Sequence, residues 1–370
     1  MNKWLTFKLH TVTSLFTFLL LLGVLVACDD DQTEETEQFN RSVMLENMAT
    51  ELIVPNFIQL QASVDQLHAA TRTFTENTNE ANLLALREAW VAAVTDFQHC
   101  SAFGFGPASL PLGPFADVIG VFPVDEQEVE QNIGDPAFNL AASFRRDVRG
   151  FYTVEYLIYG NDTPETAMVN NFDADRKAYL QLIVGELKTI TDNIVTEWNS
   201  SYLDEFTTND GTSAGSPVSE LYNEFVKDYE NLKNFKVELP AGLTAGQEGA
   251  DPTLVEAYYS GISRSLIVEQ FESSKNIWFG RTRNGQDIIG FEEYLNSVVG
   301  GPDLVETSKE AINDIDAAIA AIPQTRLSEQ VEHPSLVTLR NELQDNTANF
   351  KSSMSSLLGI SITFNSGDGD

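Results

Sequence analysis

The sequence has 370 residues, of which 22 are Lys or Arg and 55 are Asp or Glu, so its formal net charge is −33. A protein with this charge repels nucleic acid and anionic lipid headgroups, and we expect no nucleic-acid partner. Its two cysteines provide neither a disulfide framework nor a cysteine metal site.

Residues 1–27 predict a secretory signal peptide. Lys3 and Lys8 precede an apolar run at 15–26, which ends in Leu-Val-Ala-Cys28. A basic start, a short apolar run and a small residue before the cut are typical of such signals. Leu-x-Ala-Cys is similar to a bacterial lipobox, so we expect Cys28 to be lipidated. The alternative is a transmembrane anchor, but the run is shorter than the ~20 residues that a span needs.

Residues 28–40 predict a tether, because they are mostly acidic and polar and hold almost no core-forming residue. We therefore expect an exported protein that is anchored to the cell envelope through the lipid on Cys28. The expected place is the outer membrane, on its periplasmic or its surface face. The sequence leaves the membrane and the face open.

Apolar residues recur at helical spacing through the rest of the chain, and alternating strand patterns are nearly absent. The pattern therefore predicts an all-α fold. The expected helices are 43–74 with an interruption at Pro55, 79–97 with Asn79 as N-cap, 173–198, 218–235, 254–277, 304–322 and 334–358.

Two segments interrupt the helical pattern. Gly and Pro recur through 103–136, and long irregular segments inside compact domains are often functional. Residues 209–217 are the clearest linker in the chain. We therefore expect an N-terminal helical bundle at 41–205 and a C-terminal helical bundle at 217–370.

An internal repeat supports this division. The pattern Phe-x7-Phe-Gly begins at Phe97 and again at Phe271. Each copy is followed by a Gly-Phe element that contains Glu-Tyr-Leu, which begins at Gly150 and again at Gly290. Two such matches in the same order indicate a duplicated helical unit, and two antiparallel bundles packed side by side follow from it.

The run at 149–160 is apolar and aromatic but holds one carboxylate, Glu155. A lone acid in such surroundings is costly to bury unless it is paired, ligated or protonated. Tyr152 lies three residues earlier, so on a helix the two side chains share a face. The counter-charge for Glu155 is expected from the arginines just upstream, Arg145, Arg146 and Arg149.

This run resembles the Gly-x-His-x-x-Glu motif of imelysin-like proteins, the M75 peptidase family. Here the motif positions are Gly150, Tyr152 and Glu155, so Tyr stands where the family has His. Other segments resemble family motifs in the same order: Ala89-Trp90, Phe97, Phe103–Gly106, Tyr259–Ser263, Ile277–Gly280 and the tail Phe364–Asp370. The resemblance covers nearly all of the chain after the tether. It implies two pseudo-symmetric helix bundles with a pocket between them.

The resemblance also implies a metal-binding pair, Tyr152 and Glu155. A phenolate and a carboxylate suit Fe(III) better than Zn(II), so the cofactor expected from it is iron. The alternative is that Tyr152 packs in the core and its hydroxyl bonds Glu155. The pocket residues expected from the resemblance are Trp90, Phe103, Arg149, Gly150, Ser263, Asp368 and Asp370.

Histidines are few. A zinc hydrolase needs about three protein ligands, mostly His, and after Cys28 only His68, His99 and His333 are present, at unrelated spacings. His99 lies opposite Trp90 on its expected helix, which predicts that it faces solvent. No catalytic residue is assigned.

Three hypotheses about function follow. The first is an imelysin-like envelope lipoprotein that binds iron or an iron-associated ligand in the pocket, is linked to iron uptake and is not catalytic. The second is an M75-type metallopeptidase. The third is a structural lipoprotein that docks an envelope protein partner.

Overall fold

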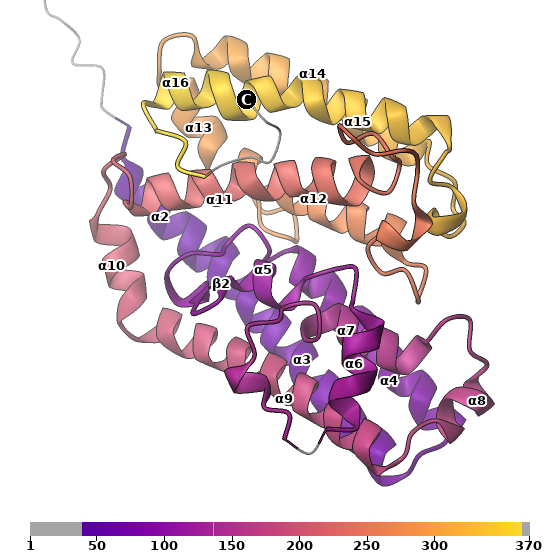
Figure 1. The fold of residues 1–370 in the computed structure, drawn as a ribbon. Helices are drawn as coiled ribbons and strands as arrows, with labels where there is room; N and C mark the ends of the chain where they lie inside the picture. The colour runs from indigo at the N-terminus through magenta and orange to yellow at the C-terminus, as the bar shows by residue number, and fades with distance from the viewer. Residues whose placement is uncertain (1–38, 136, 365–370) are drawn as a thin grey trace, which may run out of the picture. The chain divides into compact units, whose positions relative to one another are not determined.

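Helices account for nearly all of the regular structure in the computed structural model, which describes residues 39–135 and 137–364 (Figure 1). The all-α prediction is confirmed. Within these residues the strands are a two-residue antiparallel pair, β1 (Ser109–Leu110) and β2 (Gly113–Pro114). None of the described helices combines the length and the apolar character needed to cross a membrane. The signal peptide, Cys28, the acidic part of the tether, Asp368 and Asp370 lie outside the described residues.

The N-terminal half begins with α2 (Arg41–Asn47), which continues through a π-helical turn, η1 (Met48–Ile53), into α3 (Val54–Glu76). Then follow α4 (Glu80–Gln98), η2 (Gly106–Ala108), α5 (Phe115–Ile119), α6 (Glu126–Ile133), η3 (Leu140–Ala142), α7 (Gly150–Tyr159), α8 (Glu165–Asn170), α9 (Ala174–Glu197), η4 (Trp198–Tyr202) and α10 (Leu203–Thr208). The C-terminal half contains α11 (Pro217–Asn231), η5 (Leu232–Glu238), η6 (Pro252–Leu254), α12 (Ser263–Phe279), α13 (Phe291–Asn296), α14 (Gly301–Ala320), η7 (Leu327–Glu329), α15 (Pro334–Thr347), η8 (Ala348–Ser353) and α16 (Met354–Leu358).

Two predicted helix signals are confirmed. Pro55 lies in the first turn of α3, directly after the π-helical turn, where its missing N–H costs little. Asn79 caps α4, because its side chain accepts a hydrogen bond of 3.0 Å from the backbone N–H of Asn82. Both signals are local, so the sequence alone was sufficient to find them.

One predicted helix start is wrong. The helix expected at 254–277 begins at Ser263, and the residues before it form η6 and a series of turns. Ala257 and Gly261 have positive φ angles of 51° and 78°, which a right-handed helix does not allow. These turns carry Glu256.

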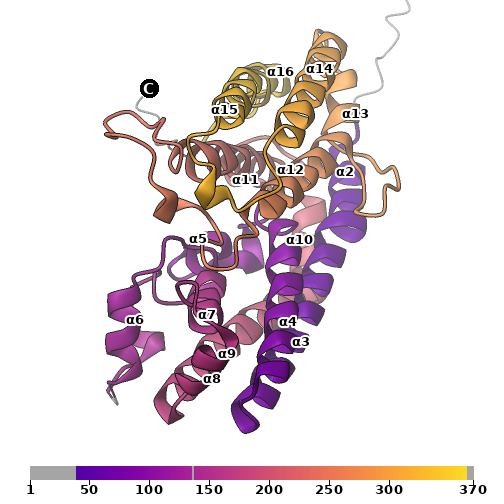
Figure 2. The same ribbon diagram turned by 90° about the vertical axis from the view of Figure 1, so that its right-hand side faces the viewer.

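Helices α3, α4, α7 and α9 contact one another in the N-terminal half, and α11 to α16 lie together above them in both views (Figures 1 and 2). Trp90 on α4 is fully buried, and its indole N–H donates to the carbonyl of Phe151 on α7 at 2.8 Å. The two halves meet where α4 contacts α12 and where α2 contacts α11.

The order of contacts repeats between the halves. Helix α4 contacts α7 and α7 contacts α9, just as α12 contacts α13 and α13 contacts α14. The repeated glycines occupy matching places: Gly150 begins α7, and Gly290 precedes α13. This arrangement is consistent with the predicted duplication. Asn40–Asp370 nevertheless forms one compact unit, and its division into bundles at 41–205 and 217–370 stays a prediction.

Candidate functional site

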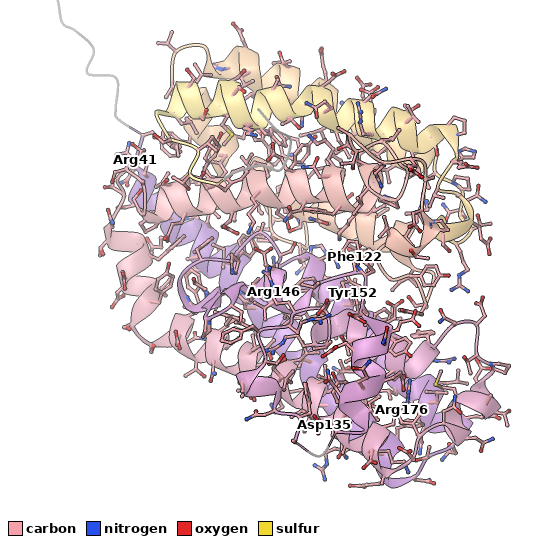
Figure 3. All side chains as sticks on the ribbon, in the orientation of Figure 1. Arg41, Phe122, Asp135, Arg146, Tyr152 and Arg176 are labelled. Atoms are coloured by element: carbon pink, nitrogen blue, oxygen red, sulfur yellow. The ribbon has the colours of Figure 1, made fainter. Side chains whose placement is uncertain are left out.

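A cavity of about 550 Å³ lies between the two halves, where the resemblance implies a pocket. The N-terminal half contributes the end of α4 and the irregular segment around α5. The C-terminal half contributes α11, η5, the turn that holds Glu256, and Gln270 on α12. Figure 3 labels three residues at this level, Arg146, Phe122 and Tyr152; the first two line the cavity, and the ring of Tyr152 packs edge-on against Phe122 at 5.4 Å.

Glu256 is the centre of a buried polar cluster beside this cavity. Its side chain is 2% exposed, and Oε1 lies 2.8 Å from the Lys236 ammonium. The Tyr152 hydroxyl donates to the same carboxylate oxygen, and the Gln98 amide donates to it at 3.3 Å. Lys236 also donates to Gln98 Oε1 at 2.6 Å, and the Ser263 hydroxyl donates to the Glu256 carbonyl. One carboxylate thus joins α4, α7 and η5.

Glu155 is buried nearby but has a different partner. Its Oε1 accepts a hydrogen bond of 2.7 Å from the backbone N–H of Ser260. Burial raises the pKa of Glu155 to about 8, against the lowering effect of the Ser260 hydrogen bond, and the charge of Glu256 adds to the rise. At neutral pH this carboxyl is therefore mostly protonated, so it needs no cation beside it.

The expected ion pair between an upstream arginine and Glu155 is wrong. Arg149 pairs with Glu186 at 2.7 Å, and Arg145 pairs with Asp125 at 2.6 Å. Arg146 donates to the carbonyl of Asp117 at 3.2 Å. Arg149 lies in extended backbone before α7 begins, so its side chain leaves toward α9 rather than along the helix that carries Glu155.

The alternative to metal binding is half right: Tyr152 packs in the core at 1% exposure, but its hydroxyl donates to Glu256 and not to Glu155. Burial, followed by the charge of Glu256, raises the pKa of Tyr152 well above its usual value, so the phenol stays protonated. Tyr152 and Glu155 both line a small cavity of about 10 Å³, which is the size of one water molecule or one small ion.

The scan of family models matches residues 53–354 of this chain to Imelysin, peptidase family M75. Iron-regulated protein A of Synechococcus elongatus is 21% identical over 77% of this chain and 76% of its own length. The family match spans most of the chain. The chain belongs to the imelysin family.

Two solved structures have the same fold. A putative iron-regulated protein A precursor from Parabacteroides distasonis superposes with a TM-score of 0.70 at 18% identity, over 86% of this chain and 95% of that one. An imelysin-like protein from Psychrobacter arcticum superposes with a TM-score of 0.69 at 20% identity, over 88% and 97% of the two chains. These likenesses establish the imelysin fold for residues in both halves of the chain.

The structure places the residues that the imelysin resemblance suggested for the pocket at different depths. Trp90, Phe103 and Gly150 are buried in the N-terminal half and do not line the 550 Å³ cavity. Arg149 is 4% exposed and holds α7 to α9 through Glu186. Ser263 joins the polar cluster through the carbonyl of Glu256.

His99 is buried, so the prediction that it faces solvent is wrong. Its side chain is 3% exposed and its Nε2 lies 2.9 Å from Glu269 on α12. His99 caps the end of α4, and this face of the helix is covered by α12, which the apolar spacing within α4 alone does not reveal. Cys100 is a buried free cysteine. Within residues 39–135 and 137–364, no group of three or more His, Cys, Asp or Glu side chains is placed to hold a metal ion.

Glu155→Gln tests the protonation of Glu155. The pKa of about 8 in the folded protein exceeds the usual 4.5, so the folded state holds a proton that the unfolded chain loses. The stability that this proton contributes is complete below about pH 4.5 and is lost as the pH rises toward 8. Gln keeps the acceptor for Ser260 and carries no charge. We expect the unfolding free energy of the variant, minus that of wild type, to rise with pH by up to about 1.4 kcal/mol per unit between pH 5 and 8.

The measurement is urea denaturation at a series of pH values. Glu165→Gln is the matched control of opposite sign, because the backbone at the start of α8 and then Arg87 lower the pKa of Glu165. The stability that Glu165 contributes is therefore lost as the pH falls, and its variant should approach wild type at low pH. If the unfolding free energies of Glu155→Gln and wild type changed in parallel between pH 5 and 8, the raised pKa of Glu155 would be contradicted.

Proposed function

We propose that this imelysin-family protein is an exported, lipid-anchored envelope protein that binds a small ligand in the 550 Å³ cavity, in connection with iron uptake and without catalysis. The observation that carries the proposal is the cavity itself. It is of the size that ligand sites have, about 300–1,000 Å³, and it holds a few buried polar groups among aromatic rings. Two halves of the chain supply its lining, so a bound ligand would contact both.

The link to iron rests on two observations. The Synechococcus elongatus relative is named an iron-regulated protein. Tyr152 and Glu155 offer phenol and carboxyl oxygens, hard donors that suit Fe(III), at a cavity of about 10 Å³. To ligate iron, the Tyr152 hydroxyl would give up its proton and its hydrogen bond to Glu256. Both residues remain proposed ligands.

Metal uptake tests the iron part. The purified protein is soaked separately with Fe(III), Fe(II) and Zn(II), desalted, and its metal content is measured by mass spectrometry. We expect wild type to retain Fe(III) at up to one ion per chain and Tyr152→Phe to lose it, because Phe keeps the ring and removes the oxygen. Tyr258→Phe is the control, since it removes a tyrosine hydroxyl from the same small cavity without touching the pair. Equal iron content in wild type and Tyr152→Phe would overturn the proposal that Tyr152 and Glu155 bind iron.

A cleavage assay on the same purified protein distinguishes this proposal from the peptidase alternative. Cleavage of a denatured protein substrate that is abolished both by a chelator and by Glu155→Gln would replace the non-catalytic function with metallopeptidase activity. The pH experiment above shows whether Glu155→Gln is folded, so a loss of cleavage could be assigned to chemistry. A single stoichiometric protein recovered from envelope extract with the anchored chain, together with no metal uptake, would favour the docking alternative instead.

A further inference from the structure

The turn between α13 and α14 holds an apolar side chain out in solvent. Val299 in this turn is 98% exposed, the largest exposed fraction of any large hydrophobic side chain in residues 39–135 and 137–364. The turn is tight: Gly300 has a φ of +83°, and a Cβ at Gly301 would lie 1.7 Å from the carbonyl oxygen of Leu295. The Gly301 backbone N–H donates to the carbonyl of Val298 at 3.0 Å. The backbone thus fixes Val299 in water, where it adds almost nothing to the hydrophobic core.

The surface around Val299 is built from two uncharged segments. Residues 296–302 and 352–363 contain no Asp, Glu, Lys or Arg, although 21% of the whole chain is charged. The segments meet, because a Cβ at Gly300 would lie 3.6 Å from the side chain of Leu357, and α13 contacts α16. Val298 and Leu357 are both partly exposed. We call Val298, Val299 and Leu357 the apolar tip.

The apolar tip lies at the end of the folded part where the tether joins it. Helix α2 begins at Arg41, whose guanidinium lies over the Tyr294 ring of α13 at 5.9 Å, and both views place the two helices at the same end (Figures 1 and 2). Residues 28–40, between the predicted lipid on Cys28 and α2, span at most about 45 Å. A folded domain of this size is about 50 Å across. A lipid on Cys28 would therefore bring this end to the bilayer more readily than the far end.

A bilayer fits the apolar tip better than another protein does. A stable protein interface takes about 800 Å² from each partner, far more than three side chains offer. A membrane contact beside a lipid anchor needs little area, because the anchor makes it intramolecular at an effective concentration on the order of mM. The chain has a net charge of −33, which disfavours an anionic bilayer and leaves a zwitterionic one.

We propose that the apolar tip sits in the headgroup region of a zwitterionic phospholipid bilayer, next to the lipid on Cys28. This inference rests on the lipid-anchored part of the proposed function and adds a second point of membrane contact to it. Val299 and Leu357 reach the boundary between headgroups and acyl chains, where no charged residue of the two segments has to be desolvated. Two points of contact restrict the rotation of the folded part about the lipid, so they fix which face of it the membrane covers.

Quenching by brominated lipid tests the contact. Full-length protein is purified from a host that processes its signal, labelled at Val299→Cys with a nitrobenzoxadiazole group, and placed in vesicles of phosphatidylcholine and phosphatidylethanolamine in equal parts. Val337→Cys is the matched control, because Val337 is also an exposed valine, and it lies in the first turn of α15, about 25 Å along the chain's helices from α16. We expect lipid brominated near the headgroup to quench the label at 299 at least about twofold more than the label at 337. Labelled wild type measures the background from the buried Cys100.

Mass spectrometry of the N-terminal peptide separates the two ways of failing. Acyl chains on Cys28 together with equal quenching at 299 and 337 would overturn the membrane contact and leave the anchored protein in place. That result would hold whether the tip stays in water or a second copy of the chain covers it. A mature chain without acyl chains on Cys28 would overturn both this inference and the lipid-anchored part of the proposed function. Both substitutions are at exposed positions, so neither is expected to prevent folding.

Discussion

Lys236→Met is expected to lower the free energy of unfolding by about 3–5 kcal/mol, because it leaves the buried carboxylate of Glu256 without its cation. The Lys236 side chain is 8% exposed, and its ammonium lies 2.8 Å from Glu256 and 2.6 Å from the Gln98 amide oxygen. Met has a similar length and a similar helix propensity, so the charge and its hydrogen bonds are what the substitution removes. Chemical denaturation at pH 7 measures the loss.

A double-mutant cycle identifies the cause. In Lys236→Met/Glu256→Gln the stranded charge is gone, and we expect the double variant to recover most of the stability lost in Lys236→Met. Lys309→Met is the matched control on α14, where the side chain is 37% exposed and its ammonium lies 2.9 Å from Glu292, and it should cost less than about 1 kcal/mol. Additive losses in the double variant would mean that the pair does not couple, and the description of the cluster would be wrong.

Local rules found most of the fold and the buried acid beside this cluster. The spacing of apolar residues located the long helices, and the lone acid in an apolar run led to Glu155, which is indeed buried. The irregular segment that was expected to be functional contributes five cavity residues, Ala116, Asp117, Gly120, Val121 and Phe122. Those signals depend on neighbours in the sequence, so the sequence contains them.

Glu256 was missed because its position depends on tertiary structure. Residues 254–262 have enough apolar spacing to resemble the first turns of α12, and a helix would have carried Glu256 elsewhere. The positive φ of Ala257, an unusual conformation for a residue with a side chain, turns the chain into the site instead. The available signal was the one that selected Glu155: Glu256 is also a single acid between apolar neighbours, Val255 and Ala257.

The partners of charged side chains could not be predicted for a related reason. Glu155 was expected to need a cation, whereas burial raises its pKa to about 8 and it stays mostly neutral at pH 7. Arg149 and His99 each bond a carboxylate on another helix, Glu186 and Glu269. A pairing between distant segments is fixed by how the helices pack, and the spacing of residues within one helix does not encode it.

Gly150→Ala is expected to lower the free energy of unfolding by more than about 4 kcal/mol or to prevent folding. Gly150 has a φ of +79°, where a side chain is strained, and a Cβ there would lie 2.1 Å from the carbonyl oxygen of Ile119. That oxygen belongs to the backbone of α5, so relief requires a helix to move. Helix α5 borders the 550 Å³ cavity, and α7 carries Tyr152 and Glu155, which line the 10 Å³ cavity. The close approach at Gly150 therefore fixes the positions of both helices relative to each other.

Gly185→Ala is the control for this substitution. Gly185 lies inside α9, and a Cβ there would meet nothing within 4 Å, so the change should stabilise the protein by up to about 1 kcal/mol through helix propensity. Thermal and urea denaturation of both variants measure the contrast. If the two glycines respond alike, the Gly150 position of the motif is not held by close packing against α5. A direct role in the pocket, as the family resemblance first suggested, would then be the better explanation for a glycine at this place.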